Sequence, residues 1–254
     1  MQQNETASLR GAAEAFQRLV DQSSCIVAFT GAGISTESGV PDFRSPDSPW
    51  LVNKPIHFSE YLASEAARID AWQRKFRMDD LYAGAKPGRT HRALAKMVEA
   101  GQIEAIITQN IDNLHQASGV APEKIIELHG NGSFAECLTC QRRHELSFVR
   151  GVFEKSGCPP ICEACGGIVK SATISFGQSI PTEALRRAKE ISESCDLFIV
   201  LGSSLSVKPA ARLPLIAQHN GAKLVIVNRE MTPLDIYADL TIHDDIGNFI
   251  KLLI

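Results

Sequence analysis

Short apolar segments recur along the chain, and each is followed by a turn and a stretch with helical spacing. The segments are 25–29, 105–108, 124–128, 172–176, 197–201 and 223–227. Short apolar runs rich in β-branched residues are typical of strands buried on both faces of a parallel sheet. Strands that alternate with helices indicate βαβ units. The pattern therefore predicts an α/β fold with a Rossmann-like, doubly wound parallel sheet.

Two stretches interrupt this rhythm. Residues 45–85 are rich in aromatic and charged side chains and predict a loop followed by helices over 59–68 and 70–82. Residues 136–168 are rich in cysteine, glycine and proline. We expect 45–85 (a helical insertion) and 136–168 (a metal-binding module) to pack together as a small domain. Residues 1–44, 86–135 and 169–254 then form the large Rossmann-like domain, which opens with an amphipathic helix over 8–20.

Composition narrows the function classes. Hydrophobic residues make up 44% of the 254 residues, and the net charge is −3. This balance is ordinary for a globular protein and lacks the basic footprint of a nucleic-acid binder. No apolar run is long enough to cross a bilayer, and the first 21 residues lack signal-peptide and transit-peptide features. We expect a cytoplasmic protein with no nucleic-acid or membrane partner, and the sequence leaves its oligomeric state open.

Four cysteines form two Cys-x-x-Cys pairs, Cys137 with Cys140 and Cys162 with Cys165. Two such pairs in one chain favour tetrahedral zinc over a redox centre, which usually has a single pair. All four ligands are thiols, so no coordination position is open for water. The zinc is therefore expected to hold the small domain together and to take no part in catalysis. Cys158 is a competing fourth ligand with a less regular spacing.

The segment after the first predicted strand has closely spaced glycines, Gly31 and Gly33, but Thr36 where a third glycine would complete a dinucleotide fingerprint. Such loops bring the backbone close to a phosphate. The incomplete motif alone is a weak signal for a nucleotide.

Polar residues follow the strand 105–108 directly. Gln109, Asn110 and Asp112 lie where the carboxyl ends of parallel strands line a ligand crevice. Their amide and acid groups can hold a ribose and orient a water. Asn110 or Asp112 can instead cap the helix that follows, although three polar residues exceed what a cap needs.

Two later strands end in a similar way. Gly202, Ser203 and Ser204 repeat the pattern of strand, glycine and hydroxyl, and form a second candidate contact for phosphate or ribose. Asn228, with Glu230 nearby, can hold an adenosine ribose. A turn residue is an equally good interpretation of Asn228.

His129 ends the strand 124–128 and precedes a glycine. A histidine there is either a hydrogen-bonded structural residue or, beside the polar segment at 109–112, a general base with a suitable pKa. His91 is interpreted as a helix-start residue and His115 as a structural residue on a helix.

In this order, the glycine loop, the Gln-Asn-x-Asp segment, Leu-His-Gly at 128–130, Gly-Ser-Ser at 202–204 and the cysteine pairs resemble the sirtuin family of NAD-dependent protein deacylases. The resemblance runs from about Ser24 to the C-terminus. It implies that NAD is consumed as a co-substrate with an acylated lysine of a protein or peptide. Nicotinamide leaves, and a histidine base activates a ribose hydroxyl, giving free lysine and O-acyl-ADP-ribose.

The resemblance also implies residue roles. His129 is similar to the catalytic base, Asn110 and Asp112 to the catalytic nicotinamide-pocket pair, and Gln109 to a ribose contact. Further NAD contacts fall in the flexible cofactor loop and on the adenosine side; they are Gly31, Ala32, Gly33, Thr36, Asp42, Phe43, Arg44, Gly202, Ser203, Ser204, Asn228 and Glu230. The edges that would hold the substrate peptide as an added strand are marked by Phe176, Gly177 and Val207.

The chain departs from the family pattern near the expected substrate site, at 171–175 and at Gln178. The Tyr-x-x-Arg pair of succinyl-selective sirtuins is absent, so we expect an acyl pocket that favours apolar chains, with Arg74 and Arg77 as the cations nearest to it. The segments 54–56 and 72–76 resemble the branch that includes mitochondrial lipoamidase and ADP-ribosyl-transferring sirtuins.

Three other functions stay open on the sequence: an ADP-ribosyltransferase or NAD hydrolase, a non-catalytic NAD-sensing module, and a dehydrogenase. His129 favours deacylation over transfer, because ADP-ribosyl transfer needs no base to move an acyl group. A sensor needs only the binding loops, and a dehydrogenase is expected to have a standard glycine motif closed by an acidic residue.

Overall fold

The computed structural model describes residues 2–42, 48 and 55–253. The α-helices are α1 (Gln2–Asp21), α3 (Phe58–Ala63), α4 (Glu65–Leu81), α5 (Arg89–Glu99), α6 (Leu114–Ala117), α7 (Leu146–Ser156), α8 (Thr182–Ser194), α9 (Leu213–His219) and α10 (Ile246–Ile250). The strands are β1 (Ile26–Thr30), β2 (Ile103–Thr108), β3 (Ile125–Glu127), β4 (Gly130–Cys137), β5 (Arg143–Glu145), β6 (Val169–Thr173), β7 (Leu197–Leu201), β8 (Lys223–Val227) and β9 (Leu240–Ile242). No described helix is long and apolar enough to cross a membrane.

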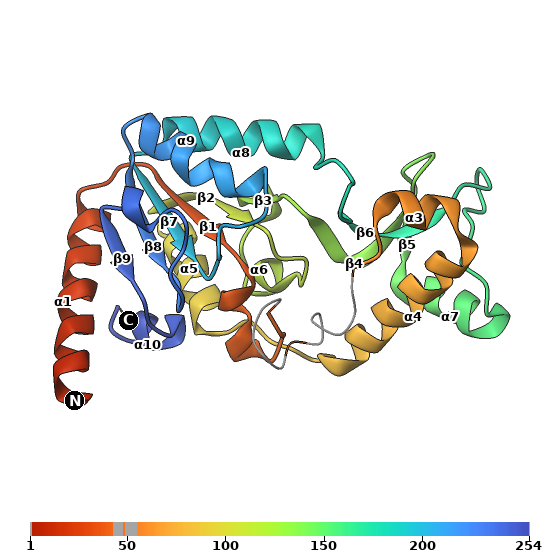
Figure 1. Ribbon diagram of the computed structural model, residues 1–254, viewed down its shortest axis with the longest axis horizontal. Helices are drawn as coiled ribbons and strands as arrows, with labels where there is room; N and C mark the ends of the chain where they lie inside the picture. The colour runs from red at the N-terminus through yellow and green to blue at the C-terminus, as the bar shows by residue number, and fades with distance from the viewer. Residues whose placement is uncertain (1, 43–47, 49–54, 254) are drawn as a thin grey trace.

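Six strands form one parallel sheet in the order β3-β2-β1-β7-β8-β9 (Figure 1). The chain winds outward from β1 in one direction and then from β7 in the other, so the order reverses between these two strands. Thr30 at the end of β1 lies opposite Thr108 of β2 and Leu201 of β7. The carboxyl ends of the three central strands are therefore level, and the point of reversal between β1 and β7 is where such sheets bind ligands.

Alternation along β1 explains why helices cover both faces. Ile26 and Ala28 pack into a core with α1, α5 and α10, whereas Val27 and Phe29 face the opposite core beneath α8 and α9. Successive side chains of a strand point to opposite faces, so an all-apolar strand needs cover on both. The predicted doubly wound α/β fold is confirmed.

A second, antiparallel sheet has the order β5-β4-β6 and lies beside α3, α4 and α7, away from the parallel sheet (Figure 1). Its own apolar core includes Trp72 and Phe76 of α4, Phe153 of α7 and Val169 of β6. The Trp72 and Phe76 rings are stacked 5.4 Å apart. This sheet also uses residues 130–135 and 169–173, beyond the predicted module 136–168, and the domain division stays a prediction.

The prediction of a parallel strand over 172–176 is wrong. The strand there is β6, Val169–Thr173, and it pairs antiparallel with β4. Beyond Lys170 its residues are only partly buried, and Phe176 is 56% exposed. A short apolar run does not reveal the direction of its partner strand, which depends on contacts with distant residues.

One smaller prediction also needs correction, and one strand was missed. The break between the helices of the 45–85 insertion falls at Ser64, whose hydroxyl accepts a hydrogen bond from the Ala67 N–H and caps α4. The strand β9 was not predicted, since its three residues are too few to show a periodic pattern.

The loops after β1 and β7 touch backbone to backbone. The Gly31 N–H donates to the Leu201 carbonyl at 3.0 Å, and the Gly33 N–H donates to the Gly202 carbonyl at 2.9 Å. A Cβ on Gly33 would lie 2.7 Å from Gly202 Cα, and a Cβ on Gly202 would lie 2.7 Å from the Ile34 nitrogen. These N–H groups are already engaged, so the glycines permit close approach of the loops rather than donating to a phosphate themselves.

We expect Gly202→Ala to destabilise the fold by roughly 1–3 kcal/mol more than Gly101→Ala, because it adds overpacking to backbone strain. Both glycines have positive φ, +64° and +72°, but no atom within 4 Å would meet a Cβ at Gly101. Strain alone costs about 1–2 kcal/mol. Urea unfolding of both variants measures the difference. Equal losses of unfolding free energy in the two variants would mean that the loops after β1 and β7 can move apart at no cost in stability.

Candidate active site

One cavity of about 1050 Å³ opens at the carboxyl ends of β1, β2 and β7 and continues between α4 and β6. The predicted catalytic, NAD-binding and peptide-binding residues that the structure describes all line it. They are Gly31, Ala32, Gly33, Thr36, Asp42, Gln109, Asn110, Asp112, His129, Phe176, Gly177, Gly202, Ser203, Ser204, Val207, Asn228 and Glu230. Phe43 and Arg44 lie outside the described residues. The fold therefore brings together segments that are far apart in the sequence.

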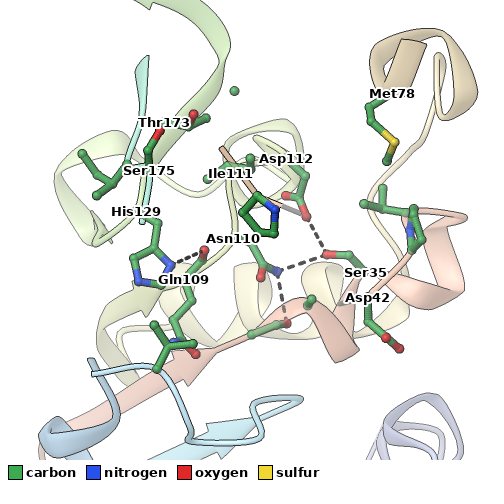
Figure 2. Close-up of a pocket in the computed structure, with 18 of the residues that line it drawn as sticks. Ser35, Asp42, Met78, Gln109, Asn110, Ile111, Asp112, His129, Thr173 and Ser175 are labelled. Atoms are coloured by element: carbon green, nitrogen blue, oxygen red, sulfur yellow. Dashed lines mark hydrogen bonds between the residues drawn. The ribbon is translucent and has the colours of Figure 1, made fainter. Parts of the chain in front are cut away.

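Asn110, Ser35 and Asp112 form a hydrogen-bonded set at the centre of the cavity wall (Figure 2). Asn110 Nδ2 donates to the Gly31 carbonyl at 3.1 Å and to Ser35 Oγ at 3.2 Å. Ser35 Oγ in turn donates to Asp112 Oδ2 at 2.7 Å. The set fixes an amide and a carboxylate side by side, as recognition of a carboxamide requires.

The N-cap of α6 is Asn113, so the interpretation of Asp112 as the N-cap is wrong, although Asp112 still bonds to the start of the helix. Its Oδ1 accepts a hydrogen bond from the Leu114 N–H at the start of α6, while Oδ2 faces Ser35. One carboxylate thus anchors a helix and contributes to the cavity wall. Ser35 was missed from the sequence, although its hydroxyl in the glycine loop was a usable signal.

The loops after β2 and β7 are joined by side chains. Ser203 Oγ donates to Gln109 Oε1 at 2.6 Å, and the Gln109 N–H donates to the Thr30 carbonyl at 2.9 Å. Gln109 is therefore held at both its backbone and its side chain. This places its amide group at the switch point between β1 and β7.

His129 lies between the two sheets, with its ring directed into the cavity (Figure 2). Its Nδ1 is 3.0 Å from the Gln109 carbonyl oxygen, which can only accept, so Nδ1 carries the proton. Nε2 then has a free lone pair. Burial lowers the pKa of His129 below its ordinary 6.5, although the hydrogen bond to Gln109 opposes this shift. The ring is therefore a neutral acceptor at pH 7.

The edges predicted to hold a peptide lie at the mouth of the cavity. Phe176 and Val207 are 56% and 37% exposed, and the Phe176 carbonyl accepts from the Phe58 N–H. Gly177 has φ +79°, and a Cβ there would lie 2.0 Å from the His57 ring. The imidazole thus packs on bare backbone next to Phe176.

One face of α4 also lines the cavity, including Trp72, Lys75 and Met78. Lys75 pairs with Asp79, and burial lowers the pKa of Lys75 although Asp79 raises it. Arg74 lies on the wall as well and pairs with Asp70 at 2.5 Å.

A buried cation faces the same cavity from the opposite wall. The Lys170 ammonium group donates to the carbonyls of Ser171 and Thr173, and burial lowers its pKa to about 8. The sequence pattern gave no sign of this lysine, because its position depends on the antiparallel pairing of β6.

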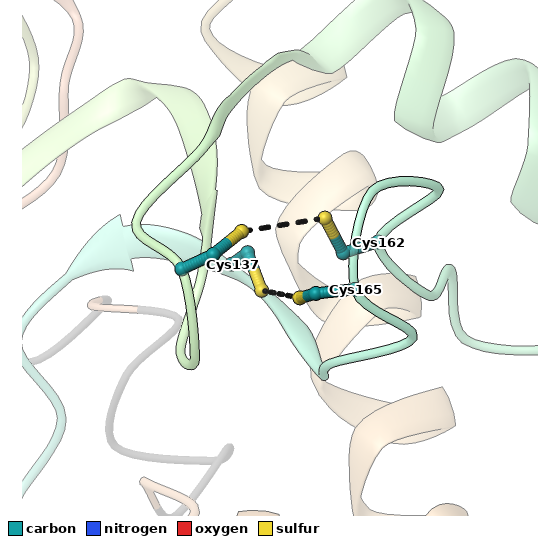
Figure 3. Close-up of side chains that lie close together, drawn as sticks. Cys137, Cys162 and Cys165 are labelled. Atoms are coloured by element: carbon teal, nitrogen blue, oxygen red, sulfur yellow. Dashed lines mark hydrogen bonds between the residues drawn. The ribbon is translucent and has the colours of Figure 1, made fainter.

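The four cysteines of the two pairs converge in the small module (Figure 3). All four sulfur atoms lie within 4.8 Å of one another, with Cys137 and Cys165 at 3.4 Å and Cys140 and Cys162 at 3.7 Å. A zinc ion with bonds of about 2.3 Å sets its sulfur ligands roughly 3.8 Å apart. Disulfides would need about 2.05 Å. The donor set therefore fits zinc, and Cys158 is not part of it.

The pKa shifts of the clustered thiols also indicate that a cation is needed there. The Cys140 and Thr139 N–H groups lower the pKa of the Cys137 thiol to about 6. The Gly167 N–H lowers the pKa of Cys165, but the neighbouring sulfur atoms raise it to about 12. Four thiolates thus repel one another unless a metal ion neutralises them.

The fold and the site define a Rossmann-like α/β protein with a Cys₄ module and a deep cavity at the switch point. The Sir2 family model matches residues 31–209. The chain belongs to the Sir2 family, the sirtuins.

The comparisons place it among full-length relatives. It is 55% identical over 240 residues to an "NAD-dependent protein deacetylase" of Rhodopseudomonas palustris, covering 94% of this chain and 95% of the relative. It is 52% identical to "NAD-dependent protein deacetylase 1" of Bradyrhizobium diazoefficiens, covering 95% and 94%. A solved Sir2 structure with a p53 peptide and NAD⁺ is 39% identical, with a TM-score of 0.80, and covers 93% of this chain and 95% of that one.

We expect Cys137→Ser and Cys162→Ser to lose the metal and destabilise the small module, because structural zinc contributes folding free energy. Metal analysis of purified protein is expected to give about one zinc per chain in the wild type. Cys158→Ser is the matched control, since Cys158 is exposed and outside the cluster. Unchanged zinc in both cluster variants would contradict the assignment.

Proposed function

We propose that this chain is an NAD-dependent protein lysine deacylase that consumes NAD and releases nicotinamide and O-acyl-ADP-ribose. The observation that carries the proposal is His129, a neutral histidine with a free Nε2, in the same cavity as the Asn110, Ser35 and Asp112 set. A binding module has no need of such an acceptor. Relatives bearing the name NAD-dependent protein deacetylase cover nearly the whole chain.

Two parts of the cavity wall suit the two ends of NAD, its adenosine and its nicotinamide. On the adenosine side the cavity is lined by Ser203, Ser204, Asn228 and Glu230, next to the backbone contact of the loops at Gly33 and Gly202. The paired amide and carboxylate of Asn110 and Asp112 face the nicotinamide side. When bound, NAD supplies a ribose carbon with nicotinamide as its leaving group.

The acid–base work falls to His129. Its Nδ1–H is held by the Gln109 carbonyl, which keeps the lone pair of Nε2 directed into the cavity. A proton from a ribose hydroxyl passes to Nε2, and the developing imidazolium keeps its hydrogen bond to Gln109. General bases of this kind contribute about 10²–10⁴ in rate.

The substrate is an acylated lysine in a peptide that adds as a strand between the edge at Phe176–Gly177 and the edge at Val207. Exposed apolar side chains on both edges support this arrangement. A zinc ion held by Cys137, Cys140, Cys162 and Cys165 would have no coordination position left for water and would contribute to folding rather than to catalysis. The predicted domain division and the cytoplasmic location stay predictions.

In an assay with NAD and an acetyl-lysine peptide, we expect mass spectrometry to detect deacetylated peptide and O-acetyl-ADP-ribose. ADP-ribosylated protein would indicate a transferase, and free ADP-ribose alone a hydrolase. His129→Ala is expected to lower kcat by about 10²–10⁴ with NAD affinity retained. His219→Ala, at an exposed site away from the cavity, is the control. A His129→Ala variant with near-normal kcat would overturn the base assignment.

In the wild type we expect the acid limb of the kcat/KM profile to have its midpoint below pH 6.5, because burial lowers the pKa of His129.

Acyl preference follows from the paired charges on α4. On α4, Lys75 and Arg74 are each held by a carboxylate, so a succinyl group would compete with Asp79 or Asp70 for these cations. Lys170 already donates to the Ser171 and Thr173 carbonyls, and Arg77, the other cation expected near the pocket, also lines the cavity but is exposed. We expect kcat/KM for acetyl or longer aliphatic lysine to exceed that for succinyl-lysine by roughly tenfold or more, since an unpaired carboxylate in this cavity is costly. Asp79→Asn removes the carboxylate that pairs with Lys75, so it is expected to reduce the difference in kcat/KM between acetyl-lysine and succinyl-lysine. A higher kcat/KM of the wild type for succinyl-lysine would show that a cation lining the cavity binds the succinyl carboxylate.

A further inference from the structure

Two polar residues flank His129 and take no part in the chemistry above. Glu127 ends β3 of the parallel sheet, and Asn131 lies near the start of β4 of the antiparallel sheet. Only Leu128 and His129 separate the two strands, so His129 lies at the junction of the sheets. Neither Glu127 nor Asn131 is among the described residues that line the cavity. Any effect of theirs on catalysis therefore passes through a neighbour.

The Asn131 side chain makes every hydrogen bond that an amide can make. Its Oδ1 accepts from the N–H and the hydroxyl of Ser133, at 2.8 and 2.6 Å. Its Nδ2 donates to Glu127 Oε1 at 2.7 Å and to Asn113 Oδ1 at 3.1 Å. The Ser133 N–H can only donate, which fixes Oδ1 as the acceptor and Nδ2 as the donor. An amide that is 5% exposed and fully satisfied is held in one conformation.

The bond between Asn131 and Glu127 spans the turn that carries the base. It joins the side chains two residues before and two residues after His129. Within this span Gly130 has φ +71°, and a Cβ there would lie 2.0 Å from a backbone carbonyl oxygen of β6. The His129 carbonyl accepts from the Ile174 N–H, just after β6, at 2.8 Å. The turn at 128–130 is thus fixed by side chains and by backbone.

Glu127 is bound by neutral amides. Its Oε1 accepts from Gln116 of α6 at 2.7 Å as well as from Asn131. Burial raises the pKa of Glu127, the two amides lower it, and the nearby Asp112 raises it. The carboxylate therefore serves as a hydrogen-bond acceptor, and a glutamine in its place could accept the same two bonds.

Asn131 also connects this turn with the polar segment at 109–113. Its bond to Asn113 reaches the N-cap of α6, directly after that segment's Asp112. A second bond between the same two parts of the chain joins the Gly132 N–H to the Ile111 carbonyl at 2.8 Å. The turn with the base and the segment with the nicotinamide pair are therefore held at a fixed separation.

We propose that Asn131 and Glu127 are positioning residues for His129, and that their hydrogen bonds hold its ring against the Gln109 carbonyl. The bond of 3.0 Å from His129 Nδ1 to Gln109 spans the same two parts of the chain, so it depends on their separation. The inference rests on the proposed function for its catalytic readout only.

The direct test is ¹⁵N NMR of the His129 ring in the wild type and in Asn131→Ala. The wild-type ring is expected to be protonated at Nδ1 with a pKa below 6.5. In Asn131→Ala we expect a mixture of both tautomers and a pKa nearer 6.5, because the ring gains solvent and burial is the larger cause of its shift. An unchanged tautomer and pKa in the folded variant would overturn the proposal. This readout needs no activity, so it stands even if the proposed function fails.

The catalytic test compares substitutions at both ends of the bond. Asn131→Ala and Glu127→Ala are each expected to lower kcat by about 10- to 100-fold, the cost of a base displaced by up to about 1 Å, with KM for the acyl peptide nearly constant. Glu127→Gln keeps the acceptor and is expected to retain most of the wild-type kcat. A loss in Glu127→Gln as large as in Glu127→Ala would show that the charge acts and would overturn the proposal. The Glu127 pair keeps the test valid if Asn131→Ala fails to fold.

Ser192→Ala is the matched control. Ser192 is fully buried on α8, donates to the Ala188 carbonyl at 2.6 Å and is not among the residues that line the cavity. Its loss is expected to lower thermal stability without changing kcat or the His129 tautomer. Equal losses of kcat in Ser192→Ala and Asn131→Ala would mean that stability alone is responsible and would overturn the positioning role.

Discussion

The site depends on the backbone contact between the loops after β1 and β7. Gly33 and Gly202 lie so close that a single Cβ on either would meet main-chain atoms at 2.7 Å. The strand order reverses between β1 and β7, so the chain leaves these two neighbouring strands in opposite directions. This reversal brings the two loops together and forms a crevice at the carboxyl ends of both strands. The backbone contact joins the segments that carry Ser35 and Ser203, and these side chains in turn hold Asp112 and Gln109.

Burial and hydrogen bonding together set the chemistry at that crevice. The Gln109 carbonyl fixes the tautomer of His129, and burial keeps the ring neutral, so the acceptor nitrogen is prepared before any substrate binds. Behind it, no carboxylate of the described residues hydrogen-bonds to the side chains of Thr30, Thr108, His91 or His115. Preorganised polar groups of this kind need no rearrangement when charge develops.

The small module contributes a wall and a mouth to the cavity. Its core packs Trp72 and Phe76 of α4 against Cys137 and Cys162, so zinc binding and the placement of α4 are coupled. Lys75 and Met78 lie on the same helix and line the cavity, so a metal bound by the four cysteines would stabilise one wall of the cavity without taking part in catalysis.

The sequence by itself determined the parallel sheet, the four zinc ligands and most of the site. Apolar runs such as Leu197–Leu201, Cys-x-x-Cys spacing and polar residues directly after strands are local signals with a direct physical meaning. It misplaced 172–176, and it did not reveal Ser35 or Lys170 as lining the cavity, or the contact between His91 and His115. Those depend on which distant segments meet: β6 pairs antiparallel with β4, and α5 and α6 bring two rings within 5.1 Å. Only the tertiary structure decides such contacts, because the free energy that selects them comes from burial shared among residues far apart in the chain.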